Sequence, residues 1–356
     1  MMRKLLFILA LSLLVLPASA EHANRTGGEK RHAERAAPAP TRSSHATRPV
    51  QPRSAETEVR DRINAGSVGL AAGLLEGAPL RFATEISRVV NDGGKVHVLP
   101  IVTRGPTENV NDLLYLKGVD LAIINSDSLD EYRAQVPEIG SRIVQVMNLF
   151  PSELHVFVRP EIKSLADLAG KKVNFNTQGT AAAYSGPLIF SRLGIEVEKT
   201  FVPHPVALEQ MRKGEGEMAA VVFVTSKPVD AFVKRKWDEG FKFLPVPFDP
   251  RLADYYVSAS LTSADYPALV PAGQTVETIA VPTVLVAYNW NPGSPRYDRV
   301  KAFVNELFGK LDQLRTPGFD PKWKDANPSA SVPGLQRLKA AQNWQDPHMA
   351  NRTGRP

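Results

Sequence analysis

The strongest constraint on the fold is an alternation of strand-like and helix-like segments that begins near Asp61 and continues along most of the chain. In residues 80–92, Phe82, Ile86 and Val89 recur at helical spacing, which predicts an amphipathic helix. The apolar run at residues 119–125 predicts a buried strand. Strands that alternate with helices form a mainly parallel sheet covered by helices, so the sequence predicts an α/β fold.

Caps and turns divide the chain further. Pro106 stands where the first turn of a helix tolerates proline, and Ser164 with Asp167 has the spacing of a capping box. In the first half we expect a short strand over 62–66, a glycine-rich turn over 67–77 and a helix over 80–92. These are followed by a strand over 95–103, a turn with a helix over 104–118, a strand over 119–125 and a helix over 126–136. In the second half we expect two strands around Pro151, then strands over 171–175, 199–205, 218–225, 241–246 and 276–289, and helices over 180–193, 206–215, 227–240 and 250–256.

Two α/β units of similar size suggest two lobes with a ligand cleft between them. In open α/β sheets, ligands bind beyond the carboxyl ends of the strands, where loops meet the first turns of helices. Four such loops are rich in small or polar residues: 66–69, 103–107 and 125–127 in the first lobe, and 176–180 in the second. We therefore expect a donor-rich site where these loops face each other.

The segment 174–194 predicts the second lobe's part of that site. A turn at Gln178-Gly179-Thr180 precedes a helix that opens with three alanines. The first turn of a helix offers free N–H groups and a partial positive charge, which favour an anion. Tyr184 lies one turn after Thr180 on the same face and can form a wall. In the alternative interpretation, Gly179 only makes a turn and Tyr184 only packs.

The sequence contains no motif for catalysis, nucleotide binding or metal binding. It lacks G-x-G-x-x-G, the P-loop and the G-x-S-x-G elbow. His97, His155 and His204 are far apart, no His-x-x-x-His spacing occurs, and there is no cysteine for a disulfide, a thiolate ligand or a lipid anchor. We expect no catalytic residue, no metal and no cofactor, so the protein is not expected to be an enzyme.

The amino-terminal residues predict export. Arg3 and Lys4 precede an apolar run from Leu5 to Leu16 and an Ala18-Ser19-Ala20 cleavage site, the pattern of a signal peptide cleaved after Ala20. The apolar run is too short to span a bilayer, and the missing cysteine excludes a lipid anchor, so we expect a free periplasmic protein. Residues 21–58 are rich in Ala, Pro, Arg and Ser and predict a disordered tail, as residues 346–356 predict a frayed end.

The net charge gives no reason to expect nucleic acid as a partner. Of the formal +6, Arg3 and Lys4 contribute two charges and residues 21–60 contribute three. One positive charge remains for the rest of the chain. Nucleic-acid binding requires a basic patch on the folded domain, which this balance does not supply.

Four stretches in order resemble one family of exported receptors. They are "INAGSVGLAAGLLEG", "IVTRGPTENVNDLLYLKGVDLAIINSD", "SLADLAGKKVNFNTQGTAAAYSGPLIFSRLGI" and "YPALVPAGQTVETIAVPTVLVAYN". In this order they resemble the TAXI subfamily of solute-binding proteins of tripartite ATP-independent periplasmic (TRAP) transporters, over about residues 60–344. The sequence departs from the Gly-Ser-Gly-Thr turn of many relatives at 176–180, where Gln178 adds an amide.

The resemblance implies a type II periplasmic-binding-protein-like fold, with two lobes, a hinge and an interlobe ligand cleft. Its crossovers would fall near 150–155 and 247–255, so that residues 59–152 plus 252–345 form lobe 1 and 153–251 form lobe 2. The resemblance also implies a monomer that delivers a small organic anion, such as a carboxylate or an amino acid, to a membrane permease driven by an ion gradient.

We therefore predict a periplasmic solute receptor whose ligand contacts come from both lobes. The expected contacts are Ser67, Val68, Thr103, Asn125 and Ser126 in the first lobe, and Thr177, Gln178, Gly179, Thr180 and Tyr184 in the second. Two alternatives stay open: a subunit that presents the bound solute to a membrane sensor, and an exported enzyme that uses the cleft.

Overall fold

The computed structural model describes residues 54–91 and 95–344. The predicted signal peptide 1–20, residues 21–53 of the predicted tail, Gly93-Gly94 and the segment 346–356 lie outside the described residues. The described residues all belong to one compact unit, Arg53–Pro356. Among them, no helix is long and apolar enough to cross a membrane.

The first described element is a helix, where the sequence predicted the end of a tail and a short strand. Helix α1 (Ala55–Gly66) begins at Ser54, whose side chain accepts a hydrogen bond from the Thr57 backbone N–H. The next element is strand β1 (Ser67–Gly73), where a glycine-rich turn was predicted. Both predictions are wrong. A Cβ on Gly69 would lie 2.0 Å from the carbonyl oxygen of Gly118, so glycine serves close strand packing here and not a turn.

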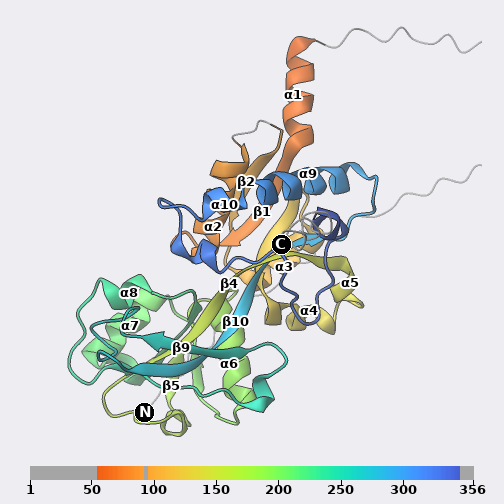
Figure 1. Cartoon of the computed structure of the whole chain (residues 1–356). Coiled ribbons are helices and arrows are strands. Elements are labelled where there is room, and N and C mark those ends of the chain that lie inside the picture. The colour runs from red at the N-terminus through yellow and green to blue at the C-terminus, as the bar shows by residue number, and fades with distance from the viewer. Residues whose placement is uncertain (1–53, 92–94, 345–356) are drawn as a thin grey trace, which may run out of the picture. The chain divides into compact units, whose positions relative to one another are not determined.

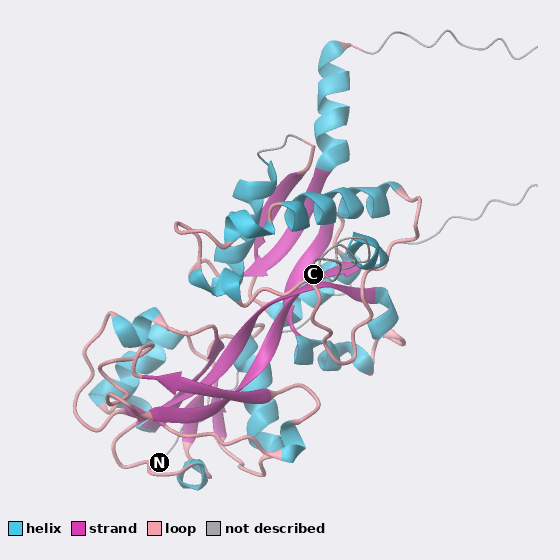
Figure 2. Cartoon of the chain, viewed as in Figure 1, coloured by secondary structure: helices cyan, strands magenta, loops and turns pink. Residues whose placement is uncertain are grey.

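The first lobe is built on strands in the order β2-β1-β3-β10-β4 (Figure 1). Strands β2 (His97–Val102), β1 and β3 (Val119–Asn125) are parallel, and β10 (Thr275–Tyr288) runs antiparallel between β3 and β4 (Ile143–Val158). Two buried clusters cover this sheet, and Figure 2 shows the helices that lie beside its strands. One contains residues of α2 (Ala78–Val90), α9 (Pro295–Gly309), α10 (Leu311–Leu314) and the 3-10 helix η6 (Pro321–Lys324), and the other contains residues of α3 (Pro106–Tyr115), η2 (Ser126–Leu129) and α5 (Ile139–Arg142). The short helix α4 (Asp130–Arg133) follows η2.

The second lobe repeats the same strand order, β6-β5-β7, next to β4. Its strands are β5 (Lys172–Asn174), β6 (Glu198–Thr200), β7 (Met218–Thr225), β8 (Lys242–Phe243) and β9 (Val257–Thr262). Its helices are α6 (Ala181–Arg192), α7 (His204–Lys213), α8 (Asp230–Val233), η3 (Leu165–Leu168), η4 (Glu215–Glu217) and η5 (Pro250–Leu252). The capping box at Ser164 and Asp167 is confirmed. The helix expected over 227–240 shortens to α8.

Strands β4 and β10 run side by side from one lobe into the other (Figure 1). Strand β4 pairs with β10 up to Glu153 and with β7 from Glu153 to Val158, so it is one continuous strand where two were predicted. Strand β10 pairs with β9 up to Ala280 and then with β4 and β3.

The second crossover therefore lies in β10, and its predicted place at 247–255 is wrong. Leu252 and Tyr256 are buried in the hydrophobic core around β5 and α6, and Leu261 and Tyr266 are buried in the core around α7 and β8. The segment that was assigned to lobe 1 from residue 252 onward thus packs with the second lobe until it enters β10.

Candidate ligand-binding site

The loops after β2 and β5 contact each other across the two lobes. The Thr107 hydroxyl donates to the carbonyl oxygen of Gly179 over 3.3 Å. A Cβ on Gly105 would lie 2.6 Å from the same carbonyl oxygen, and a Cβ on Gly179 would lie 2.9 Å from Cβ of Arg104. The structure thus brings the loop containing Thr103 together with the predicted turn at Gly179, and glycine is required on both sides of the contact.

Thr103 itself is used inside the first lobe. Its hydroxyl donates to Oδ1 of Asn109 over 2.6 Å, and the amide of Asn109 donates to the carbonyl oxygens of Ala72 and Ile123, each over 2.7 Å. Asn109 is fully buried in α3. This network fixes the carboxyl ends of β1, β2 and β3 relative to α3, so it sets the position of the first-lobe loops.

The turn before α6 has the local geometry predicted for it. Thr180 is the N-cap of α6, and its side chain accepts a hydrogen bond from the Ala183 backbone N–H over 3.3 Å. Gly179 has a φ of 91°, which favours glycine. Thr177 is half-buried, and its carbonyl oxygen accepts the Thr180 hydroxyl. Gln178 is exposed.

Asn125 lies on a buried polar row where the lobes join. Its amide donates to Oγ1 of Thr283 over 3.3 Å, and the hydroxyls of Thr283 and Ser152 lie 2.7 Å apart. These three residues come from β3, β10 and β4, which are consecutive neighbours in the sheet. The row links the predicted site residue Asn125 to both crossover strands.

Asp127 lies next to the predicted site residue Ser126 and joins the two lobes directly. The Tyr256 hydroxyl, from the second-lobe core, donates to Oδ2 of Asp127 over 2.7 Å. The carboxyl group is fully buried, and burial raises its pKa. Ser185 of α6 lies close enough to lower that pKa in part, although no hydrogen bond of normal geometry joins the two side chains. The sequence analysis placed Asp127 in the polar loop 125–127 but not among the expected ligand contacts.

Several buried polar atoms of Asp127, its two sequence neighbours and Ser185 have no hydrogen-bond partner among the residues that the structure describes. They are Oδ1 of Asp127 and the hydroxyl oxygens of Ser126, Ser128 and Ser185. Buried polar groups are almost always paired, because each unpaired group costs about 1–3 kcal/mol. Four such unpaired groups, from η2 and α6, lie at this junction, where the described contacts of the chain leave their hydrogen-bonding capacity unused.

Tyr184 is half-buried beside the same acids. Burial, and then the negative charges of Asp127, Asp130 and Glu131, raise the pKa of its hydroxyl. A second tyrosine, Tyr255, donates to Oδ1 of Asp130 over 2.5 Å. The structure therefore places the predicted site residue Tyr184 at the η2–α6 junction, where two other tyrosines already bond to acids.

A second set of charges surrounds Glu153 on the crossover strand β4, and no local pattern in the sequence indicates it. Glu153 is 2% exposed, and its Oε1 lies 3.2 Å from Nζ of Lys322. Its Oε2 accepts the backbone N–H of Lys227 over 3.0 Å, and Nζ of Lys227 lies 3.0 Å from Oδ2 of Asp265. These residues come from distant parts of the sequence, so only the fold brings them together.

His155 is not placed to act as a base. It is fully buried, and burial lowers its pKa to about 3. One ring nitrogen lies 2.7 Å from the Tyr266 hydroxyl and the other lies 2.9 Å from the Glu153 carbonyl oxygen. Within residues 54–91 and 95–344, no group of three His, Asp or Glu side chains could hold a metal ion.

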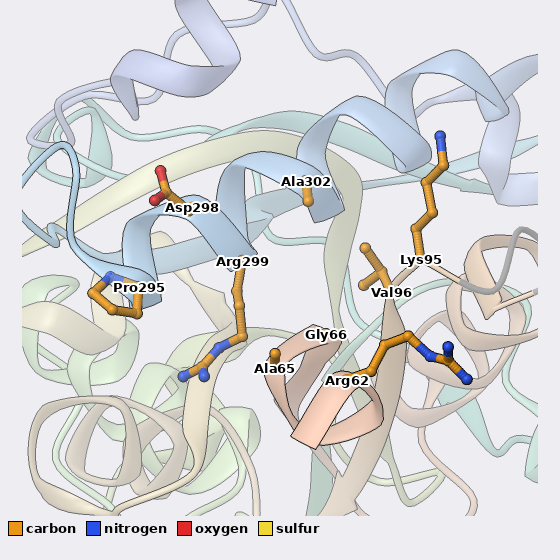
Figure 3. A pocket seen from close by; sticks show the side chains of 9 residues that line it. All are labelled: Arg62, Ala65, Gly66, Lys95, Val96, Pro295, Asp298, Arg299 and Ala302. Atoms are coloured by element: carbon orange, nitrogen blue, oxygen red, sulfur yellow. The ribbon is translucent and has the colours of Figure 1, made fainter. Parts of the chain in front are cut away.

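Ser67 and Val68 lie elsewhere. They are the first two residues of β1, so they occupy the end of the strand opposite to the interlobe loops. The pocket at that end, of about 400 Å³, is lined by residues of α1, α9 and the start of β2, among them Arg62, Lys95 and Arg299 (Figure 3). The structure separates these two predicted contacts from the other eight because β1 runs from Ser67 to Gly73, so its carboxyl end lies six residues after Ser67.

The sequence of this chain matches the model of a known protein family. The model of the NMT1-like family matches residues 80–319, which is more than half of the chain. The chain belongs to the NMT1-like family. The matched region contains the loops after β2, β3 and β5 and the residues Asp127 and Glu153.

Solved structures similar to this NMT1-like protein share low sequence identity with it. A protein of Bordetella bronchiseptica RB50 is 12% identical, with 80% of this chain and 98% of that chain covered and a TM-score of 0.48. An ancestral arginine-binding protein bound to arginine is 16% identical, with 73% and 96% covered and a TM-score of 0.42. The alkanesulfonate-binding protein SsuA from Xanthomonas axonopodis pv. citri, bound to MOPS, is 14% identical, with 82% and 95% covered and a TM-score of 0.40.

The predicted fold class is confirmed. The NMT1-like protein has the same strand order in each lobe and two crossover strands between them, which is a type II periplasmic-binding-protein-like fold. It is therefore a protein with the fold of solute-binding proteins.

Proposed function

We propose that this NMT1-like protein is a periplasmic solute receptor, which captures a small organic acid between its lobes and delivers it to a TRAP-type permease driven by an ion gradient. The observation that carries the proposal is the direct contact between Gly105 and Gly179, which brings together loops at the carboxyl ends of strands in both lobes. A solute held there closes one lobe on the other by bending at β4 and β10.

An acidic solute is favoured by the donors that these loops supply. The first turn of α6 presents backbone N–H groups beside Thr177 and Gln178, and such a turn stabilises a carboxylate without an arginine. Lys227 and Lys322 add ammonium groups near the crossover strands, each partly exposed and each shared with a carboxylate. The resemblance of the sequence to TAXI-type proteins supports the permease as partner, and the leader-like residues 1–20 support export.

The first test is a thermal-shift screen of the chain from Glu21 onward with organic acids and amino acids at millimolar concentration. A solute that binds only the folded state at 100 times its Kd stabilises that state by about 2.7 kcal/mol, so we expect a rise in Tm for at least one acid. A screen of this kind without any shift contradicts the proposal.

A matched pair of glycine variants tests the place of binding. Gly179→Ala puts a Cβ at 2.9 Å from Cβ of Arg104, whereas Gly194→Ala has a similar positive φ and nothing within 4 Å of its Cβ. Both variants should lose about 1 kcal/mol of stability from backbone strain. Only Gly179→Ala should weaken binding, by about tenfold or more, as measured by isothermal titration calorimetry. Equal affinities of the two variants would place the solute elsewhere.

A further inference from the structure

Asp127 lacks a partner for one of its two carboxyl oxygens. Its Oδ2 accepts the Tyr256 hydroxyl, and its Oδ1 accepts nothing although the side chain is fully buried. A buried ionised carboxylate is costly unless it is paired and hydrogen-bonded. The chain's own contacts therefore leave this group half satisfied.

Within the described part of the chain, no cation forms an ion pair with Asp127. The charged side chain with the largest influence on it is Asp130, which is also an acid. Arg192 of α6, the nearest basic residue of that helix to Tyr256, is paired with Asp254 at 3.5 Å and lies over the ring of Tyr255.

A neutral serine lies beside the carboxyl group of Asp127. Ser185 of α6 is close enough to affect its pKa, and its hydroxyl oxygen is buried and has no hydrogen-bond partner among the described residues. A carboxylate oxygen with a serine hydroxyl beside it can accept more than one N–H bond, because carboxylate and hydroxyl oxygens both accept. An ammonium group has three N–H donors in a small volume and matches this set.

We infer that Asp127 is the residue that selects a solute with a protonated nitrogen, which donates to Oδ1 of Asp127 and to the hydroxyl oxygen of Ser185. This inference rests on the proposed function and narrows it: among small organic acids, those that also carry an ammonium group bind best. The ammonium supplies the counterion that the chain does not, and a charge-assisted hydrogen bond of this kind is about twice as strong as a neutral one.

Asp127 and the residues that contact it belong to different lobes, so separation of the lobes gives the solute access to the carboxylate. Asp127 follows β3 of the first lobe, and Tyr256 and Ser185 belong to the second-lobe core and to α6. When the lobes separate, the Tyr256–Asp127 hydrogen bond breaks and the carboxylate becomes accessible. When they close on a solute, Ser185 and Tyr256 return to it.

The test uses pairs of solutes that differ in one amino group, measured by isothermal titration calorimetry on the chain from Glu21 onward at pH 7.5. The pairs are L-glutamate with glutarate, L-alanine with propionate, and 4-aminobutyrate with butyrate. For the pair that binds, the amino member should bind at least tenfold more tightly. In Asp127→Asn this preference should disappear, because the amino member loses the affinity that its ammonium group gained, at least tenfold, and its partner changes less than threefold.

Two further variants keep the test decisive. Asp130→Asn removes the neighbouring acid and should change the preference by less than threefold. Ser185→Ala removes one hydroxyl with little change in volume and should lower affinity for the amino member alone, by about fivefold, even if Asp127→Asn does not fold.

The outcomes separate this inference from the proposed function. Equal affinities within the pairs, or an equal loss for both members in Asp127→Asn, overturn the role of Asp127 and leave the solute receptor standing. If no member of any pair binds, the proposed function fails, and the inference fails with it.

Discussion

Two buried carboxylates, those of Glu153 and Asp127, lie between the lobes, and they differ in their hydrogen-bond and ion-pair partners. Glu153 on β4 has the ammonium of Lys322 at 3.2 Å and the backbone N–H of Lys227 at 3.0 Å. Asp127 after β3 has one hydroxyl donor, from Tyr256. Burial raises the pKa of both groups, and Lys322 lowers that of Glu153 in part.

We call Glu153 a brace, which means a carboxylate that links the two lobes permanently, whereas Asp127 is a group that binds solute. Glu153 joins Lys322, from the carboxyl-terminal part of the first lobe, to Lys227 of the second lobe without any solute. A buried carboxylate with such partners is part of the folded structure, and removing one partner lowers the free energy of unfolding. A carboxylate left incomplete costs stability in the free protein and recovers that cost only when a partner arrives. Substitutions at the two sites should therefore act in opposite directions.

The largest effect is expected for Glu153→Gln. It leaves the Lys322 ammonium without its buried partner, and we expect a loss of about 3 kcal/mol in the free energy of unfolding. This is the low end for such a pair, because Lys322 keeps Asp325 at 3.4 Å. Urea denaturation measures the loss. The double variant Glu153→Gln with Lys322→Met should recover most of it, and a double variant as unstable as the single one would argue against the brace.

The next effect is acid sensitivity from His155, which packs against this brace. Its pKa is lowered to about 3 in the folded protein, against about 6.5 in an unfolded chain. A depressed pKa contributes stability that is present above pH 6.5 and is lost as the pH falls toward 3. Between pH 6.5 and 5 we expect a loss of about 2 kcal/mol, since each pH unit in this window is worth about 1.4 kcal/mol.

Denaturation curves at several pH values check this, with two histidine variants for comparison. His155→Gln should flatten the profile between pH 6.5 and 5. His97→Gln, at the half-buried start of β2, should leave the profile as in the unsubstituted protein. A His155→Gln profile as steep as the original would assign the acid sensitivity to other groups.

The smallest effect is expected for Asp127→Asn in the absence of solute, and its sign is reversed. A raised pKa means that the stability present at low pH is lost as the pH rises through that pKa. The neutral amide avoids this loss, so we expect a gain of about 1 kcal/mol at pH 8 and no difference at pH 4. A loss at pH 8 comparable with that of Glu153→Gln would show that Asp127 is also a brace.

Local signals in the sequence were sufficient for much of the second lobe's part of the site. Thr180 begins α6 as its N-cap, Gly179 takes the positive φ that a tight turn requires, and Ser164 and Asp167 form their capping box. Each depends on residues within a few positions of one another. Local capping and turn chemistry decides such features, so a single sequence is sufficient to predict them.

The first lobe shows where local signals mislead. The run at 67–73 looks like a glycine-rich turn, but Gly69 is needed because the carbonyl of Gly118, in the turn before β3, approaches it closely. Asp127 looks like one more polar residue of the loop 125–127, because no local spacing shows its burial against Tyr256, 129 residues away. Glu153 and Lys322 are 169 residues apart. Tertiary contacts decide all three, and no local pattern encodes them.

The path of the chain through β4 and β10 has a consequence for how this protein can change. The second lobe leaves the first along β4 and returns along β10, and these two strands are hydrogen-bonded neighbours from Ile143–Tyr288 to Glu153–Ala280. Its two ends are thus only about 5 Å apart, the spacing of adjacent strands. One continuous segment can be exchanged there as a cassette, as is common for domains whose ends lie close together. Such an exchange would replace Ser185, Tyr184 and the turn at Gly179 together, while Asp127 and its loop stay in place.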